Sequence, residues 1–331
     1  MKKGITKILS ACVFAFVVFL AAGTQSKAAV NMGVKQTGAG SSYVELAWNA
    51  QLGAGHYHTQ FSQDGKNWID MEYSSSPSDS VYNLTQGASY YARVVAYNGS
   101  HYSGTHVMVG VSETAIVSTK PTEVTGLTQT AAGVNSVSMS WNASAGAASY
   151  VIYGYINYNW TQIGTSATNS ATITGVAATT STKFSVAAVK NVTGGTVTGD
   201  QCSGVEMKAI PIKVSRIAMQ YYWDSLKEAK YIWTDVNNAD GYQYEVKSAN
   251  GKKTYFRATS TSSYTYVKPF PRGIFVKARV RAYVTVGNKV YYGAWSPYTY
   301  HASSKKVTAK RSSNGKKIYL KWKKVSGASG Y

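Results

Sequence analysis

Histidine is the residue type in this chain whose spacing could support metal chemistry. Four of the five histidines lie between residues 56 and 106, namely His56, His58, His101 and His106. His56 and His58 flank Tyr57, so they share the outward face of a strand if Tyr57 points inward. Neutral imidazoles suit zinc, copper or nickel, which makes a metal site chemically feasible. Four solvated surface histidines are the simpler interpretation, and we therefore expect no bound metal.

Catalytic chemistry has little support elsewhere in the sequence. The chain has only 14 Asp and Glu residues, and they do not form the paired clusters that glycoside hydrolysis requires. No G-x-S-x-G, H-E-x-x-H, P-loop or C-x-x-C motif occurs. Cys202 is the only cysteine after residue 28, and we expect it to be a buried thiol without a function. We predict no catalytic residues and no cofactor.

Aromatic residues are a better guide to binding. The segment "YGYINYNW" (153–160) contains Tyr153, Tyr155, Tyr158 and Trp160, too many rings to bury in one hairpin. Exposed aromatic patches on secreted modules can stack on sugars or contact proteins. The alternative is that Trp160 covers a sheet edge. A second group, "YYW" (221–223), is also expected to be partly exposed.

Positive charge is concentrated in the C-terminal half of the chain. The formal net charge is +20, and residues 211–303 carry 14 basic and 5 acidic side chains. The alternation in "VKARVRAY" (276–283) places Lys277, Arg279 and Arg281 on the outward face of a strand. Such a stripe attracts anionic polymers with salt-dependent affinity, whereas no specific nucleic-acid motif is present. A solvated face is an equally strong alternative.

The elements that position these side chains come from an internal repeat. Four times a tryptophan is followed nine positions later by a tyrosine, and successive tryptophans are 93, 92 and 89 residues apart. Alternation of apolar and polar residues before each tryptophan predicts a strand with one face in a core. Short strands in units of about 90 residues favour β-sandwiches. The predicted core rings are Trp48 and Tyr57, Trp141 and Tyr150, Trp233 and Tyr242, and Trp322 and Tyr331.

This arrangement resembles the fibronectin type III domain, with the tryptophan on strand B and the tyrosine on strand C. The segments "FSQDGKNW" (61–68) and "STKP" (118–121) resemble the C–C′ hairpin and the inter-domain junctions of bacterial members. "KKVSGASGY" (323–331) is similar to repeats in surface proteins of Gram-positive bacteria. Leu84 and Tyr90 have the spacing of a tyrosine corner before strand F, which the later repeats lack. Strands C and F are neighbours in such a domain, which brings the two pairs of histidines into one region.

The resemblance implies an all-β chain of tandem fibronectin type III (immunoglobulin-like) β-sandwiches, three complete and one truncated. Residues 1–28 have the basic start, apolar stretch and small residues of a cleaved signal peptide, and a lipid-bearing Cys12 is the alternative. The expected domains are 31–120, 121–210 and 211–303, followed by an incomplete fourth repeat at 304–331. Because so short a piece cannot bury a core, we expect a truncated fragment of a longer protein.

Two functions fit these features. The first is an exported, non-catalytic cell-surface or secreted protein whose sandwiches act as spacers and as adhesion-type binding modules for a carbohydrate or protein ligand. The short junctions at 120–121 and 210–211 predict a semi-stiff rod, with no transmembrane segment after signal cleavage. The second is a set of accessory domains of a secreted polysaccharide- or cell-wall-degrading enzyme whose catalytic domain lies beyond Tyr331.

Overall fold

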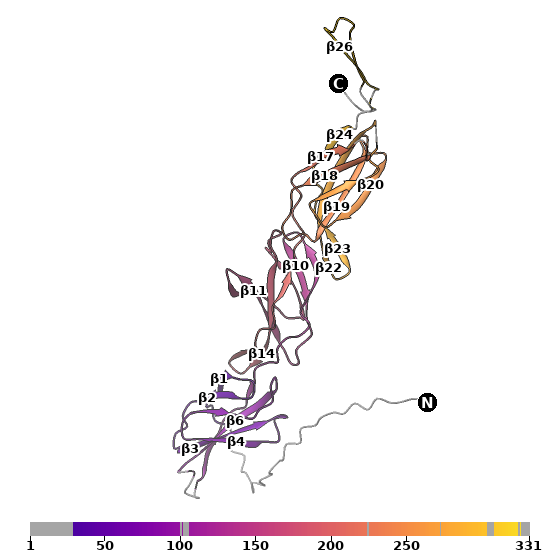
Figure 1. The fold of residues 1–331 in the computed structure, drawn as a ribbon. Helices are drawn as coiled ribbons and strands as arrows, with labels where there is room; N and C mark the ends of the chain where they lie inside the picture. The colour runs from indigo at the N-terminus through magenta and orange to yellow at the C-terminus, as the bar shows by residue number, and fades with distance from the viewer. Residues whose placement is uncertain are drawn as a thin grey trace, which may run out of the picture.

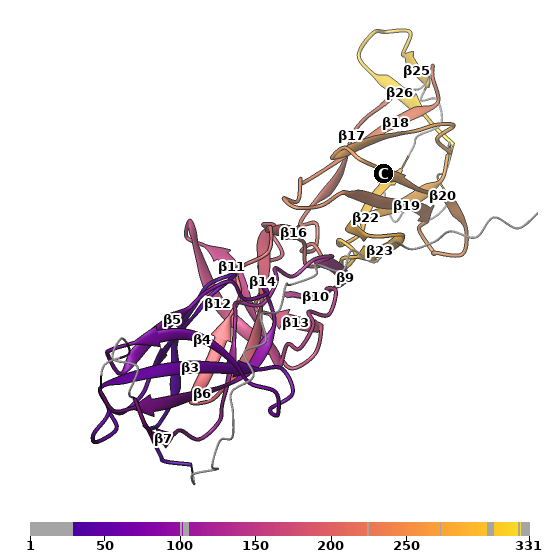
Figure 2. The ribbon, with the colours of Figure 1, turned by 90° about the horizontal axis from the view of Figure 1, so that it is seen from below.

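The computed structural model describes residues 29–99, 101, 106–223, 225–271, 273–302, 308–323 and 325. These residues form antiparallel β-sheets, as the alternation predicted, and the all-β sandwich class is confirmed. Among them, no helix is long and apolar enough to cross a membrane. The predicted signal peptide (1–28, with Cys12) and Tyr331 lie outside the described residues. Figures 1 and 2 show three sandwiches in chain order along one axis.

The first sandwich consists of two facing sheets. One has the strand order β1-β2-β5, and the other has the order β4-β3-β6-β7, with β8 also paired to β6. Inward residues at every second position, such as Val44 and Leu46, form a buried core. The hydroxyl of buried Tyr90 accepts the N–H of Thr85 at 3.0 Å, which is the contact expected of a tyrosine corner. The strands are β1 (Lys35–Ala39), β2 (Val44–Ala47), β3 (His56–Ser62), β4 (Ile69–Ser74), β5 (Ser78–Val81), β6 (Ser89–Tyr97), β7 (Met108–Val111) and β8 (Ala115–Ser118).

The second sandwich repeats this strand order. Its sheets are β13-β10-β9 and β12-β11-β14-β15, with β16 paired to β14. Cys202 is buried in its core as a free thiol. The strands are β9 (Thr128–Gly133), β10 (Ser136–Ser140), β11 (Ser149–Ile156), β12 (Asn159–Ser166), β13 (Ser170–Thr174), β14 (Thr182–Val192), β15 (Gly195–Thr198) and β16 (Val205–Met207).

The third sandwich has the same order again. Its sheets are β17-β18-β21 and β20-β19-β22-β23, with β24 paired to β22. The strands are β17 (Ile217–Trp223), β18 (Glu228–Trp233), β19 (Gly241–Ser248), β20 (Thr254–Ser260), β21 (Tyr264–Val267), β22 (Phe275–Val286), β23 (Lys289–Tyr292) and β24 (Thr299–Ala302). Three cores of similar composition therefore lie in residues 32–117, 124–209 and 214–282.

The repeated tryptophan and tyrosine meet inside each of these sandwiches. All six rings are buried, and the ring centroids of each pair are 5.3–5.5 Å apart at interplanar angles of 59–68°. Such tilted or edge-on contacts are favourable for aromatic pairs beyond the area that they bury. In each sandwich the tryptophan lies at the end of the central strand of one sheet, and the tyrosine lies at the start of a central strand of the other sheet. The pair therefore connects the two layers. The pairs are Trp48 with Tyr57, Trp141 with Tyr150, and Trp233 with Tyr242.

Trp322 was expected in a core, and the structure corrects this. It follows the hairpin of β25 (Thr308–Arg311) and β26 (Ile318–Lys321), which is a two-stranded sheet. Trp322 is 42% exposed, and Ile318 and Leu320 are more exposed still. Within the described part of the chain no second sheet covers β26, and a strand face without an opposing sheet cannot bury its side chains. Figure 1 shows this hairpin beyond the third sandwich.

Candidate functional sites

The histidine cluster lies on the outer face of the first sandwich. Tyr57 points into the core, so His56 and His58 lie on the opposite face of β3, as the alternation predicted. β3 pairs with β6, and His56 lies opposite Tyr97. The chain that leaves β6 places His101 beside both histidines, at ring-centroid distances of 5.6 Å and 5.2 Å.

Nitrogen atoms of His56, His58 and His101 all lie within 4.8 Å of one another. His58 Nε2 and His101 Nδ1 are 3.3 Å apart. His106 lies at the rim of the cluster, with its ring centroid 5.3 Å from that of His56 and 6.4 Å from that of His101. The structure therefore gathers the four predicted histidines in one region, and nitrogen atoms of three of them lie within 4.8 Å of one another.

His56 is not a surface residue, contrary to the simpler interpretation of the sequence. Its side chain is fully buried because the ring of Tyr97 stacks on it at 5.3 Å and that of Tyr73 lies 5.5 Å away. Burial also lowers the pKa of His58, an effect that the other histidines reinforce and Asp70 opposes. Burial thus favours the uncharged form of His58.

A glycine makes this arrangement possible. A side chain at Gly55 would collide with the carbonyl oxygen of Gly99. Because position 55 has no Cβ, the chain after β6 approaches the start of β3, and His56 Nδ1 lies 3.1 Å from the Gly99 oxygen. A carbonyl oxygen can only accept, so His56 Nδ1 carries the proton and donates it.

The predicted cationic stripe lies on the outer face of β22, but rings cover it. Lys277 lies 4.6 Å from the ring of Tyr298, Arg279 4.4 Å from that of Trp295, and Arg281 3.9 Å from that of Tyr292. All three cations are half-buried. We call these six residues the β22 ladder. Cation–π contacts of this kind stabilise the face and leave less of each charge open than the sequence suggested.

Glu245 lies on β19, directly opposite Arg279 of the β22 ladder. Its fully buried carboxylate pairs with Arg279 at 2.6 Å, with Arg257 at 2.6 Å and with Lys247 at 3.1 Å. Burial raises the pKa of Glu245, but hydrogen bonds from these three cations outweigh it and lower the pKa to about 2. This cluster is structural, and no sequence pattern predicted it.

The opposite face of the third sandwich carries exposed rings. Tyr221, Trp223, Tyr264 and Tyr266 come from β17 and β21, with Lys230 of β18 between them, and we call this set the aromatic platform. Trp223, Tyr264 and Tyr266 are 43%, 43% and 47% exposed. Lys230 Nζ lies 5.0–5.7 Å from the three tyrosine rings. Sequence reasoning noted 221–223 but missed 264 and 266, although "SYTYV" (263–267) shows the alternation that exposes them.

The aromatic hairpin of the second sandwich is only partly open. Tyr155 and Trp160 face each other across β11 and β12, with ring centroids 5.3 Å apart. Trp160 lies against Gly204, where a side chain would meet its ring at 2.8 Å, so part of this ring is covered by the segment before β16. Tyr153 is half-buried, whereas Tyr158 at the turn is 90% exposed. The structure does not gather these four rings into one flat surface.

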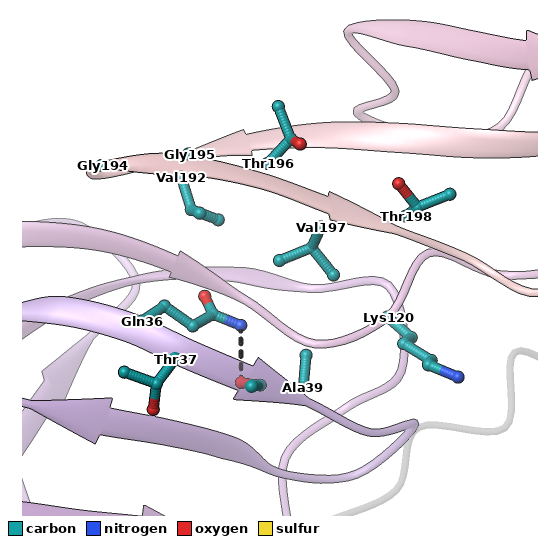
Figure 3. Close-up of a pocket in the computed structure, with 11 residues that line it drawn as sticks. Gln36, Thr37, Ala39, Lys120, Val192, Gly194, Gly195, Thr196, Val197 and Thr198 are labelled. Atoms are coloured by element: carbon teal, nitrogen blue, oxygen red, sulfur yellow. Dashed lines mark hydrogen bonds between the residues drawn. The ribbon is translucent and has the colours of Figure 1, made fainter.

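A cleft of about 370 Å³ separates the first two sandwiches. Figure 3 shows that its walls come from both, with Gln36, Thr37 and Ala39 on one side and 192–198 on the other. Its one charged lining side chain, Lys120, pairs with Asp200 at 2.8 Å. The lining is mainly backbone and small side chains, so the cleft is a seam between sandwiches rather than a site for chemistry.

Comparison with known proteins gives a partial match. No protein-family model matches the chain. Chitinase A1 of Niallia circulans is 33% identical over 162 residues, which are 46% of this chain and 22% of that protein. The match thus covers well under two thirds of the length of that relative. The FN1–FN3 domains of chicken CNTN1 match 83% of this chain and 98% of theirs, at 15% identity and a TM-score of 0.34. The strand order within each sandwich supports a fibronectin type III-like protein.

Proposed function

We propose that this chain is an exported, non-catalytic rod of sandwich modules that binds a polysaccharide through the aromatic platform of the third sandwich. The first two sandwiches act as spacers. Export rests on the pattern of residues 1–28, and the absence of catalysis rests on the scarcity of carboxylates. The aromatic platform is the single observation from which we infer that the ligand is a polysaccharide.

Three exposed rings beside one lysine suit a sugar polymer. The faces of aromatic rings carry negative partial charge and attract the C–H bonds on the flat side of a sugar ring. Lys230 supplies three hydrogen-bond donors for sugar hydroxyls or acidic groups. Because the rings come from paired strands rather than loops, they are held in place before the ligand arrives, which reduces the entropy lost on binding.

Sedimentation with insoluble polysaccharides tests this proposal. The chain is mixed with chitin or with peptidoglycan, and the bound fraction is measured against a Tyr264→Ala/Tyr266→Ala variant. We expect binding of the parent chain to at least one polymer and a loss of about tenfold or more in affinity for the variant. Tyr82→Ala is the matched control, because Tyr82 is an exposed tyrosine of the first sandwich, away from both the aromatic platform and the β22 ladder. Equal binding by the variant and the parent would contradict the proposal.

The three cations of the β22 ladder favour a polysaccharide that carries negative charge. We propose that these cations add affinity for acidic polysaccharides even though rings cover part of each charge. Retention on a polyanion column in a salt gradient measures this contribution. Elution at low salt would contradict the proposed binding of acidic polysaccharides. It would not bear on binding through the aromatic platform.

A second candidate function is that of accessory domains in a secreted polysaccharide-degrading enzyme. The observation that favours it is the similarity to Chitinase A1 over 162 residues. The gene sequence after the codon for Tyr331 distinguishes the two. A carboxylate-rich catalytic domain there favours the accessory role, and further repeats with a wall anchor favour the surface protein.

A further inference from the structure

The spacing of the histidine nitrogens in the first sandwich matches a metal site. Zinc–nitrogen bonds of ~2.0–2.1 Å at tetrahedral angles place two ligand atoms ~3.3 Å apart. His58 Nε2 and His101 Nδ1 are 3.3 Å apart. Nitrogen atoms of His56, His58 and His101 all lie within 4.8 Å of one another, which places the third donor close to the other two.

The tautomer of His56 is already that of a ligand. Its Nδ1–H donates to the Gly99 carbonyl, which leaves the lone pair on Nε2. That Nε2 atom is buried and has no hydrogen-bond partner within the described part of the chain. Histidines that bind metals commonly donate their other N–H to a backbone carbonyl, which fixes the ring and its tautomer. A buried acceptor without a donor is unfavourable, and a bound cation would satisfy it.

The surroundings exclude water on one side of the cluster. Tyr97 stacks on His56, and the ring centroid of Tyr73 lies 4.3 Å from that of His101. Strand β3 fixes two of the three histidines on a rigid element. We propose that His56, His58 and His101 bind one divalent ion of the zinc, copper and nickel class.

Titration of the full-length, untagged chain with zinc and with cobalt tests this site. We expect one ion per chain by calorimetry, and visible absorption of cobalt typical of tetrahedral coordination. His58→Gln and His101→Gln should each weaken binding about tenfold or more, because removal of even an outer-shell partner of a metal ligand costs 10–100-fold. At the same concentration, zinc should also raise the thermal midpoint of the parent chain more than that of these variants.

His301→Gln is the matched control. It removes the fifth histidine, which lies in the third sandwich beside Thr299, and it should leave the zinc affinity unchanged. Because His58 and His101 are not in the hydrophobic core, their metal-free variants should remain folded and unfold close to the temperature of the metal-free parent. Weak or non-stoichiometric binding by the parent, or binding that survives both substitutions, would overturn the proposal. Neither outcome bears on polysaccharide binding, which involves another sandwich.

Discussion

At the scale of single residues, Glu245 shows how one carboxylate can hold a face of a sandwich together. Its pKa is lowered to about 2. Between that pH and about 4.3, the carboxyl group is therefore ionised in the folded chain and protonated in the unfolded chain. The stabilisation is therefore complete above a pH of about 4.3 and is lost as the pH falls towards 2. A difference of about two pKa units corresponds to about 3 kcal/mol.

Glu245→Gln should lower the free energy of unfolding of the third sandwich by about 3 kcal/mol at pH 7, since Arg279 and Arg257 lose their counter-charge. Calorimetry at pH 6 and pH 3 measures the effect, and the difference between variant and parent should shrink at the lower pH. Glu206→Gln, an exposed carboxylate of β16, is the control and should change neither value. A Glu245→Gln effect of equal size at both pH values would contradict this account.

At the scale of elements, the tyrosine of each repeat also closes a turn. The hydroxyls of Tyr57, Tyr150 and Tyr242 accept the N–H of Gln51, Ser144 and Val236, at 3.1, 3.0 and 2.8 Å. Each donor lies three residues after the repeated tryptophan. The fixed spacing of nine between tryptophan and tyrosine is thus explained by a turn of constant length that the hydroxyl holds to the next strand.

Tyr150→Phe tests this contact, because it keeps the buried ring and removes only the acceptor. We expect the second sandwich to lose about 1 kcal/mol of unfolding free energy, the usual contribution of one hydrogen bond. Tyr155→Phe on the same strand is the control, since its ring is exposed at the surface. Equal thermal midpoints for the Tyr150→Phe variant and the parent chain would show that the turn does not depend on the hydroxyl.

Sequence reasoning reached the elements more readily than the sites. Period-two alternation and the repeated tryptophan predicted the three sandwiches, because both patterns are local and can be recognised in the sequence alone. The burial of His56 could not be predicted from the sequence, because the rings that bury it, Tyr73 and Tyr97, belong to other strands. Glu245 was missed for the same reason: Arg257 and Arg279, which make its burial tolerable, come from different strands.

At the scale of the whole molecule, the first two sandwiches are joined by more than the chain. Thr193, at the turn between β14 and β15, donates its N–H to the Ile116 oxygen at 2.8 Å. Its hydroxyl accepts the Ile116 N–H at 2.7 Å. Lys190 is almost fully buried and donates to the Gly87 carbonyl of the first sandwich. The sequence predicted a semi-stiff rod from short junctions, and these contacts supply a physical reason for stiffness.

A Lys190→Met/Thr193→Ala variant should loosen this junction while each sandwich remains folded. Met keeps most of the apolar stem of Lys190 and removes the ammonium, and Ala removes the hydroxyl that caps Ile116. Spin labels at Leu52→Cys and Tyr158→Cys, which replace exposed residues of the two sandwiches, report the distance between them in a background that carries Cys12→Ser and Cys202→Ser. We expect a broader distance distribution than in the labelled parent chain.

Asp200→Asn is the matched control for that experiment. It removes only the ion pair with Lys120, in which the aspartate side chain is 67% exposed, and exposed pairs contribute little. The distribution should therefore keep the width of the parent. Since a rod can hold a binding module at a fixed distance only if its junctions resist bending, an unchanged width in the double variant would mean that the linker itself sets the geometry. The spacer role would then rest on the short junction at 120–121 and not on the buried lysine.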